Sequence, residues 1–185
     1  MINASKGDDP LDIAEKIIDN ADLPMLGCEH AWIAAGSLLM AIKNHGEIKI
    51  TNAQIMEALN RTRKQAIGAY CGLTGVCGVA PAIGAAFSVI LGAACPKDKE
   101  TAATMHVVSK VIEAIANETG PCCCKNFVYT ALATSCRLSK EYLSIDLPCG
   151  AQIVCKDSGR HPHGCRKEKC KYYPDQPAVK DFRDQ

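Results

Sequence analysis

Half of the chain's twelve cysteines stand in three groups just before a predicted helix. The groups are Cys28, the pair Cys71 and Cys77, and the run Cys122, Cys123 and Cys124. Free amide groups and the helix dipole stabilise negative charge at a helix N-terminus, so a thiol there is expected to have a lowered pKa. The thiolate is the form that binds a metal or attacks an electrophile. The pattern therefore predicts metal or thiol chemistry at helix N-termini.

The segment between Cys71 and Gly78 is rich in glycine and has the sequence Cys-Gly-Leu-Thr-Gly-Val-Cys-Gly. Glycines let the backbone approach a bulky anion and offer amide groups to it. An iron–sulfur cluster, whose sulfides accept hydrogen bonds from amides, suits such a segment. Consecutive cysteines cannot all point into one core, so at least two of Cys122, Cys123 and Cys124 are predicted to be ligands or reactive thiols.

Three thiols and two imidazoles lie close together in the C-terminal part of the sequence: Cys155, His161, His163, Cys165 and Cys170. Thiols and imidazoles are ligands of zinc and of iron–sulfur centres. Their spacing matches none of the standard metal-binding motifs in which two residues separate a pair of ligands. The spacing therefore does not identify the metal. The basic residues around them are expected to offset thiolate charge and to solvate the segment.

The remaining candidates have weaker signals. Glu29–His30 fits a general acid/base or an extra ligand beside a cysteine, and equally an ordinary pair at a helix start. Cysteine also behaves as a small apolar residue, so two cysteines with apolar or helical neighbours are predicted to pack in the core: Cys95 and Cys136. Three others are candidates for an auxiliary role: Cys28, Cys122 and Cys149.

Length and charge narrow the class of protein. A chain of 185 residues suits one domain, and the net charge of +1 with 5% aromatic residues argues against nucleic-acid binding. The polar N-terminus resembles no secretory signal, so we expect a cytoplasmic protein with reduced thiols rather than a disulfide framework. Residues 65–96 contain no charged side chain, but prolines and glycines leave an apolar helix too short to span a membrane.

Apolar residues recur at helical spacing through most of the chain. Helices are predicted over residues 11–20, 30–44, 52–65, 99–118 and 125–143, together with an uncharged central helix after Cys77. The fold class is therefore all-α, a compact helical bundle around a central apolar helix, with an irregular cysteine-rich C-terminal lobe. The predicted division is a helical domain at 1–147, the cysteine-rich lobe at 148–177 and a solvated tail at 178–185.

Four motifs together resemble the domain-of-unknown-function family 5714, which occurs in anaerobic bacteria and methanogenic archaea, in some proteins attached to methyltransferase domains. The motifs span residues 25–173: Glu29-His30, Cys71-Gly-x-x-Gly-x-Cys77-Gly-x-Ala80, Gly120-Pro121-x-Cys123-Cys124-Lys125, and Cys155 followed by Cys165-x4-Cys170. Two positions depart from the family pattern, Cys122 in place of arginine and Asn126 in place of a second basic residue. The resemblance implies an anaerobic, metal-dependent role and no particular reaction.

Three hypotheses follow, and whether the protein is an enzyme stays open. The first is an iron–sulfur protein of anaerobic redox or sulfur metabolism, with one cluster on Cys71, Cys77, Cys123 and Cys124, while Cys155, Cys165 and Cys170 cap it or hold a second metal. The second is a helical interaction module stabilised by zinc. The third is a sulfur-transfer enzyme with a reactive cysteine at 123 or 124. A redox or methyltransferase protein and a second copy of the chain are the partners considered.

Overall fold

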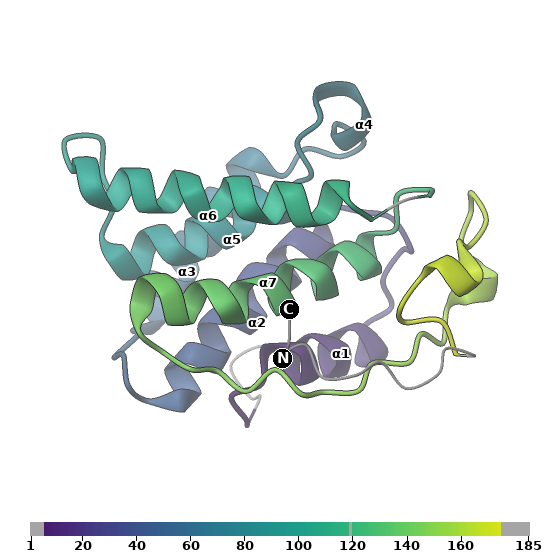
Figure 1. Ribbon diagram of the computed structural model, residues 1–185, viewed down its shortest axis with the longest axis horizontal. Coiled ribbons are helices and arrows are strands. Elements are labelled where there is room, and N and C mark those ends of the chain that lie inside the picture. The colour runs from purple at the N-terminus through teal and green to yellow at the C-terminus, as the bar shows by residue number, and fades with distance from the viewer. Residues whose placement is uncertain (1–5, 119, 175–185) are drawn as a thin grey trace.

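The computed structural model describes residues 6–118 and 120–174, which form packed helices and contain no strand. Figure 1 shows the arrangement. In chain order the helices are α1 (Pro10–Asn20), α2 (Glu29–His45), α3 (Asn52–Gln65), α4 (Cys71–Thr74), α5 (Val79–Leu91), α6 (Asp98–Ala116) and α7 (Cys124–Leu143). Two 3-10 turns follow, at Ser158–Arg160 and Lys167–Lys169. The predicted all-α class is confirmed, and α4 is the one helix that the sequence pattern missed.

Local signals explain where the helices begin and end. Thr51 forms a capping box with Gln54, in which each residue's side chain satisfies a backbone amide of the other. Gly46 ends α2 in the left-handed conformation with φ of 87°. Asp9 caps α1 by accepting hydrogen bonds from the amides of Leu11 and Asp12 through Oδ1.

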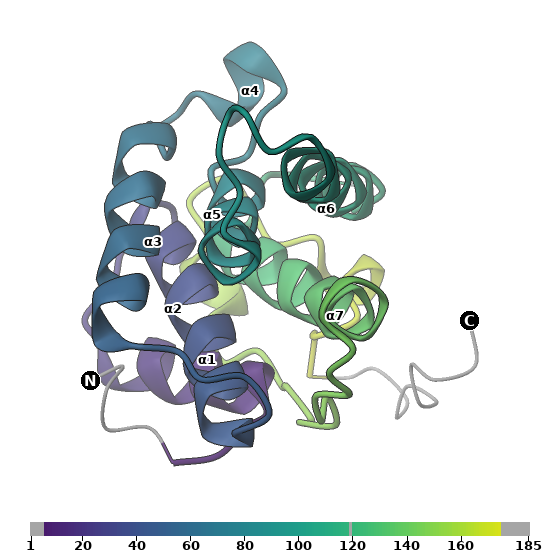
Figure 2. The same cartoon turned by 90° about the vertical axis from the view of Figure 1, so that its left-hand side faces the viewer.

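Helix α5 is the predicted central apolar helix. It lies in the middle of the bundle in the end-on view of Figure 2 and packs against α2, α3, α6 and α7. Phe87 and Ile83 on this helix are fully buried. Gly84 faces α6 so closely that a side chain there would collide with Val108, so α5 and α6 can approach each other only because this position is glycine. No described helix is long and apolar enough to cross a lipid bilayer.

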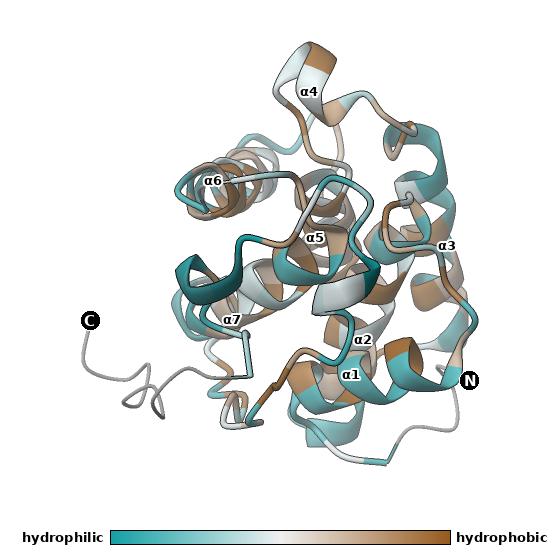
Figure 3. Cartoon of the chain, turned by 90° about the vertical axis from the view of Figure 1, so that its right-hand side faces the viewer, coloured by the Kyte–Doolittle hydropathy of each residue, from teal (hydrophilic) through white to brown (hydrophobic). Residues whose placement is uncertain are grey.

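The C-terminal lobe, defined here as residues 148–174, has no long helix and lies against one end of the bundle (Figure 1). Its start is fastened to the N-terminal part of the chain by Asp9, whose Oδ2 accepts hydrogen bonds from the amides of Gly150 and Ala151 at 2.9 Å. Figure 3 views the molecule from the lobe end and shows the turns of the lobe as largely hydrophilic. The predicted tail at 178–185 and residues 175–177 of the predicted lobe lie outside the described residues.

Candidate functional site

Most of the cysteines that the sequence singled out lie at helix N-termini, at the end of the bundle that the lobe covers (Figure 1). Cys28 is the N-cap residue of α2, and Cys71 is the first residue of α4. Cys77 comes directly before Gly78, the N-cap residue of α5. Cys123 is the N-cap residue of α7 and Cys124 its first residue. The predicted placement of thiols at helix N-termini is therefore what the fold contains.

One group of thiols, called here the first thiol set, consists of Cys71, Cys77, Cys122 and Cys124. The thiols of Cys71 and Cys122 are hydrogen-bonded to each other. The thiols of Cys77 and Cys124 interact electrostatically with each other and with those of Cys71 and Cys122, and Cys124 also interacts with the neighbouring Cys123. Cys28 lies beside this set, close enough to Cys71 for its thiol to be affected by it.

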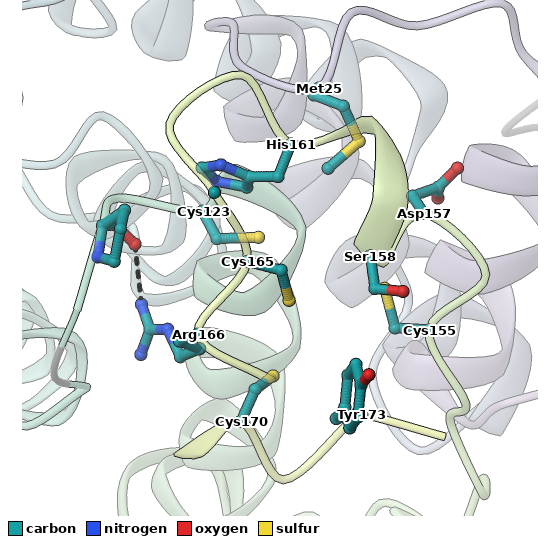
Figure 4. A pocket seen from close by; sticks show the side chains of 12 residues that line it. Met25, Cys123, Cys155, Asp157, Ser158, His161, Cys165, Arg166, Cys170 and Tyr173 are labelled. Atoms are coloured by element: carbon teal, nitrogen blue, oxygen red, sulfur yellow. Dashed lines mark hydrogen bonds between the residues drawn. The ribbon is translucent and has the colours of Figure 1, made fainter. Parts of the chain in front are cut away.

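A second group, called the second thiol set, lines one cavity between the start of α7 and the lobe. Its members are Cys123, Cys155, Cys165 and Cys170, and Figure 4 shows their side chains around the same space. Cys123 interacts electrostatically with Cys155 and Cys170. The set thus joins one cysteine of the bundle to three of the lobe.

The run of three cysteines supplies both sets because its backbone is extended. Cys123 has φ of −128° and ψ of 108°, and successive side chains of an extended segment point to opposite sides. Cys122 and Cys124 therefore face the first thiol set, and Cys123 faces the second. Of the predicted group Cys71, Cys77, Cys123 and Cys124, Cys123 also affects the thiol of Cys124, and Cys122 joins the others through its contact with Cys71. Whether these residues bind a metal stays a prediction.

Amide groups donate hydrogen bonds to thiol sulfurs in both sets. The donors are Val79 to Cys77, Gly27 to Cys124, Asn126 to Cys123 and Asp157 to Cys155, and the amide of Lys167 lies 3.3 Å from Cys165 Sγ. The side-chain amide of Asn126 also donates to Cys170 Sγ at 3.5 Å. Amide donors stabilise a thiolate more than a thiol, so they match sulfurs that are bound to a metal.

The pKa values of these thiols differ from what the helix N-termini alone predict. Burial raises the pKa of Cys77 to about 12 and that of Cys124 to about 11, and it also raises the pKa of Cys122, Cys123 and Cys155. The expectation of lowered pKa values is therefore wrong, because the loss of hydration outweighs the helix dipole and the amide donors. The nearby cations Arg166 and Lys125 offset the effect of burial only in part, so these thiols stay protonated at neutral pH, and a bound metal would offset the cost of ionising them.

The volume of the cavity that the second thiol set lines limits what could bind there. Among residues 6–118 and 120–174, no three His, Cys, Asp or Glu side chains are close enough together to hold one metal ion. Thiolates of a cluster stand further apart, because each binds a different iron. The cavity is about 20 Å3, however, room for roughly one water molecule. A cluster would have to displace the segment 157–166, where added side chains at Gly159 and Gly164 would meet no neighbouring atom.

Buried ion pairs hold the lobe to the bundle next to the second thiol set. Lys125 Nζ lies 2.7 Å from Asp157 Oδ2, with only 4% of the Lys125 side chain exposed. Arg166 pairs with Glu118 at 3.3 Å and donates to the carbonyl of Pro121 at 3.0 Å. Two buried polar atoms at this interface have no hydrogen-bond partner: Arg166 Nε and Asn126 Oδ1. The unpartnered Arg166 Nε beside the thiols is a donor that a sulfide or thiolate could use.

Of the two histidines of the lobe, His161 is held by hydrogen bonds to the backbone and His163 is exposed. His161 lines the cavity, but its Nε2 donates to the carbonyl of Cys122 at 2.9 Å and its Nδ1 accepts from the amide of His163 at 3.2 Å. Both ring nitrogens are therefore already used within the protein. His163 is exposed and stacks edge-on near His161.

The other cysteines divide in a way that the sequence anticipated only in part. Cys136 is buried as predicted, and its thiol is hydrogen-bonded to that of Cys149, which links α7 to the start of the lobe. Cys95 is exposed, so its predicted place in the core is wrong. It follows Gly92, which ends α5 in the left-handed conformation and turns the chain out to the surface.

The comparisons with known proteins identify a family for the chain. A family model matches residues 1–173 and is described as a family of unknown function, DUF5714, which confirms the resemblance seen in the motifs. No curated protein and no solved structure matched the chain. The matched residues include both thiol sets.

Proposed function

The chain belongs to the DUF5714 family, a family of unknown function, and we propose that it is an iron–sulfur protein in which each thiol set ligates one cluster. The observation that supports this most is the division of eight cysteines into two sets of four. The division arises because the side chains of Cys122, Cys123 and Cys124 point to alternate sides of an extended backbone. Four thiols complete the ligand requirement of a cubane cluster. When all four irons have a protein ligand, none has an open position for a substrate, so four thiols favour electron transfer over catalysis.

The two sets are joined by one peptide bond, which bears on how they would work together. Cys123 belongs to the second set and Cys124 to the first, and the Cα atoms of consecutive residues are about 3.8 Å apart. Iron–sulfur clusters, when bound, supply reversible one-electron transfer. Two centres ligated by neighbouring residues would lie close enough together to exchange electrons directly.

A redox partner would reach the first thiol set at the α4 segment, which projects from the bundle in Figure 1. Residues around Cys71 and Cys77 expose large apolar side chains: Ile67 at 54%, Tyr70 at 47%, Leu73 at 78% and Val76 at 44%. The segment has no charged residue between Gln65 and Pro96. Apolar side chains exposed around a buried redox group are the expected contact for a transient electron-transfer partner.

One observation favours a second candidate, a zinc ion that stabilises the lobe. The space of about 20 Å3 within the second thiol set is closer to the size of one ion than of a four-iron cluster. Zinc would require the four sulfurs to move together, whereas a cluster would require them to move apart. The sulfur-transfer hypothesis is weakened, because it needs a thiol of low pKa, and burial raises the pKa of both Cys123 and Cys124.

Metal and sulfide analysis of the anaerobically purified protein tests the proposal. We expect about four irons and four labile sulfides for each thiol set, with visible absorbance. The double variant Cys71→Ser/Cys77→Ser should lose the iron of the first set only, and Cys155→Ser/Cys165→Ser that of the second only. Cys95→Ser, at an exposed cysteine outside both sets, is the matched control and should lose none.

Two results would contradict the proposal. Protein that contains no iron or labile sulfide, and cannot be reconstituted with them, would exclude iron–sulfur clusters. Stoichiometric zinc without visible absorbance, together with loss of the lobe on chelation, would establish the second candidate instead.

A further inference from the structure

A second cavity lies beside the second thiol set, and no part of the proposed function uses it. It has a volume of about 300 Å3, within the range of small-molecule sites, and is bounded by the end of α1, the segment before α2, the start of α7 and the lobe. It shares Met25 and Asp157 with the thiol cavity. Its polar lining consists of Asp19, His30, Lys125, Lys156, Asp157 and Arg160.

The charged side chains of the lining are three cations and two carboxylates, one more cation than anions. Asp157 accepts from Lys125 at 2.7 Å and from Arg160 at 2.9 Å, so two cations share one carboxylate. Lys156, also in the lining, is paired with Asp19. Lys125 and His30 are each the second residue of a long helix, α7 and α2, whose N-terminal dipoles add to the positive potential. The cavity is therefore suited to a monoanion.

His30 also lines this cavity and has a hydrogen-bond acceptor. The residue is 1% exposed, and its Nδ1 lies 3.2 Å from the carbonyl oxygen of Gly27. A carbonyl oxygen only accepts, so Nδ1 carries the proton and the neutral ring has a lone pair on Nε2. Burial lowers the pKa of His30, and nearby Lys125 acts in the same direction, so the ring stays neutral at pH 7.

We propose that this cavity binds a small hydroxycarboxylate, with the carboxylate near Lys125, Lys156 and Arg160 and the hydroxyl donating to His30 Nε2. A carboxylate matches the single excess positive charge, whereas a phosphate dianion would exceed it. A hydroxyl suits the acceptor better than an ammonium group, which would be repelled by Lys125. The inference rests on the second cavity as it stands without a cluster, because a cluster that displaced residues 157–166 would also move Asp157 and Arg160.

Thermal unfolding of the full-length protein, followed by circular dichroism at constant ionic strength, tests the site. The probes are sodium glycolate, sodium acetate and ethylene glycol, with sodium chloride as the reference salt. A ligand that binds the folded state raises the midpoint temperature in a saturable way. We expect glycolate to bind at least about fivefold more tightly than acetate, because it also donates to His30, and ethylene glycol not to bind.

A matched pair of variants locates the effect. Lys156 and Lys140 are both exposed, at 70% and 69%, and each is paired with one aspartate, but Lys140 lies near the opposite end of α7. Lys156→Gln should weaken glycolate binding about threefold or more, and Lys140→Gln should leave it unchanged. Three results would each overturn the proposal. The midpoint temperature could be the same in glycolate as in chloride, glycolate and acetate could bind equally tightly, or the two variants could change glycolate binding equally. Iron analysis of the same sample shows whether a cluster is present, so failure of this proposal can be told apart from failure of the iron–sulfur proposal.

Discussion

The helical bundle and the C-terminal lobe are held by different interactions. The bundle buries apolar side chains from α1, α2, α5, α6 and α7 around Phe87 and Leu38, both fully inaccessible to solvent. The lobe instead meets the bundle through buried ion pairs such as Lys125–Asp157, through hydrogen bonds to Asp9, and through thiols. Its own contribution to the apolar core is small, with Cys170 and Tyr172 as its buried members.

The difference indicates which part of the molecule can fold without a ligand. Burial of apolar surface needs no ligand, so the bundle is expected to fold by itself. An irregular segment with few buried apolar residues gains too little to offset its ordering entropy, so the lobe is expected to need its charges and a metal. The four predictions below test this contrast from the largest expected effect to the smallest.

Truncation of the central core side chain should destabilise the whole molecule. Phe87→Ala removes a fully buried ring from α5 and should lower the free energy of unfolding by about 4 kcal/mol. Urea denaturation followed by circular dichroism measures the loss. If this variant loosened the lobe while the helices kept their stability, the contrast between the two regions would be wrong.

Removal of one partner of the buried ion pair should act mainly on the lobe. Asp157→Asn leaves the Lys125 ammonium in a buried place without its carboxylate, at a cost of about 3 kcal/mol. Limited proteolysis should then cut within residues 148–174, while the helical signal stays. Asp146→Asn breaks an exposed pair with Lys140 and is the matched control, with an expected cost below about 0.5 kcal/mol. Similar proteolysis of both variants would count against a charge-held lobe.

Alkaline pH should destabilise the metal-free protein through the first thiol set. The pKa values of about 12 for Cys77 and about 11 for Cys124 exceed the ordinary 9.0, so above pH 9 the unfolded chain releases protons that the folded chain keeps. Their stabilising effect is complete below pH 9 and decreases as the pH rises, by about 2 kcal/mol for the two thiols together between pH 9 and pH 10.

Urea denaturation at several pH values measures this slope. Cys77→Ser should reduce it, and Cys95→Ser, at an exposed cysteine, should leave it as it is. A slope that is unchanged in Cys77→Ser would mean that the buried thiols do not cause the loss.

Loss of a helix cap far from the lobe should have the smallest effect. Thr51→Ala removes the hydroxyl that accepts from the amide of Gln54 and should cost about 1 kcal/mol. Thr51→Ser keeps the hydroxyl and should restore most of the stability. Neither change should alter proteolysis within the lobe, and a clear increase there would show that the two regions are more tightly coupled than the contrast implies.

The helices could be predicted because their signals are local. Helical spacing of apolar residues, the capping box at Thr51 and the glycine at position 46 each act within one or two turns, and the structure contains all three. Helix α4 was missed because four residues are too few to produce a periodic pattern. The burial of Cys136 and the exposure of Cys95 depend on tertiary packing, which neighbouring residues do not determine.

The candidate cysteines could be picked out from the sequence, but which of them lie together could not. The cysteines at helix N-termini were recognisable from spacing, but the partner of each depends on how the lobe folds back over the bundle. The alternation of side chains at Cys122, Cys123 and Cys124 was the one local signal that could have separated the two sets. The raised pKa values were missed because burial, which outweighs the helix dipole, is a property of the whole fold.

The two contacts of Asp9 can form only at different times during synthesis of the chain. Its Oδ1 can cap α1 as soon as the first residues of that helix leave the ribosome. Its Oδ2 binds the amides of Gly150 and Ala151, which are synthesised 141 and 142 residues later. One carboxylate therefore takes part in both an early and a late event of biosynthesis. We expect nascent chains released before residue 150 to have a capped first helix and an open end at which the thiols remain accessible to alkylating reagents.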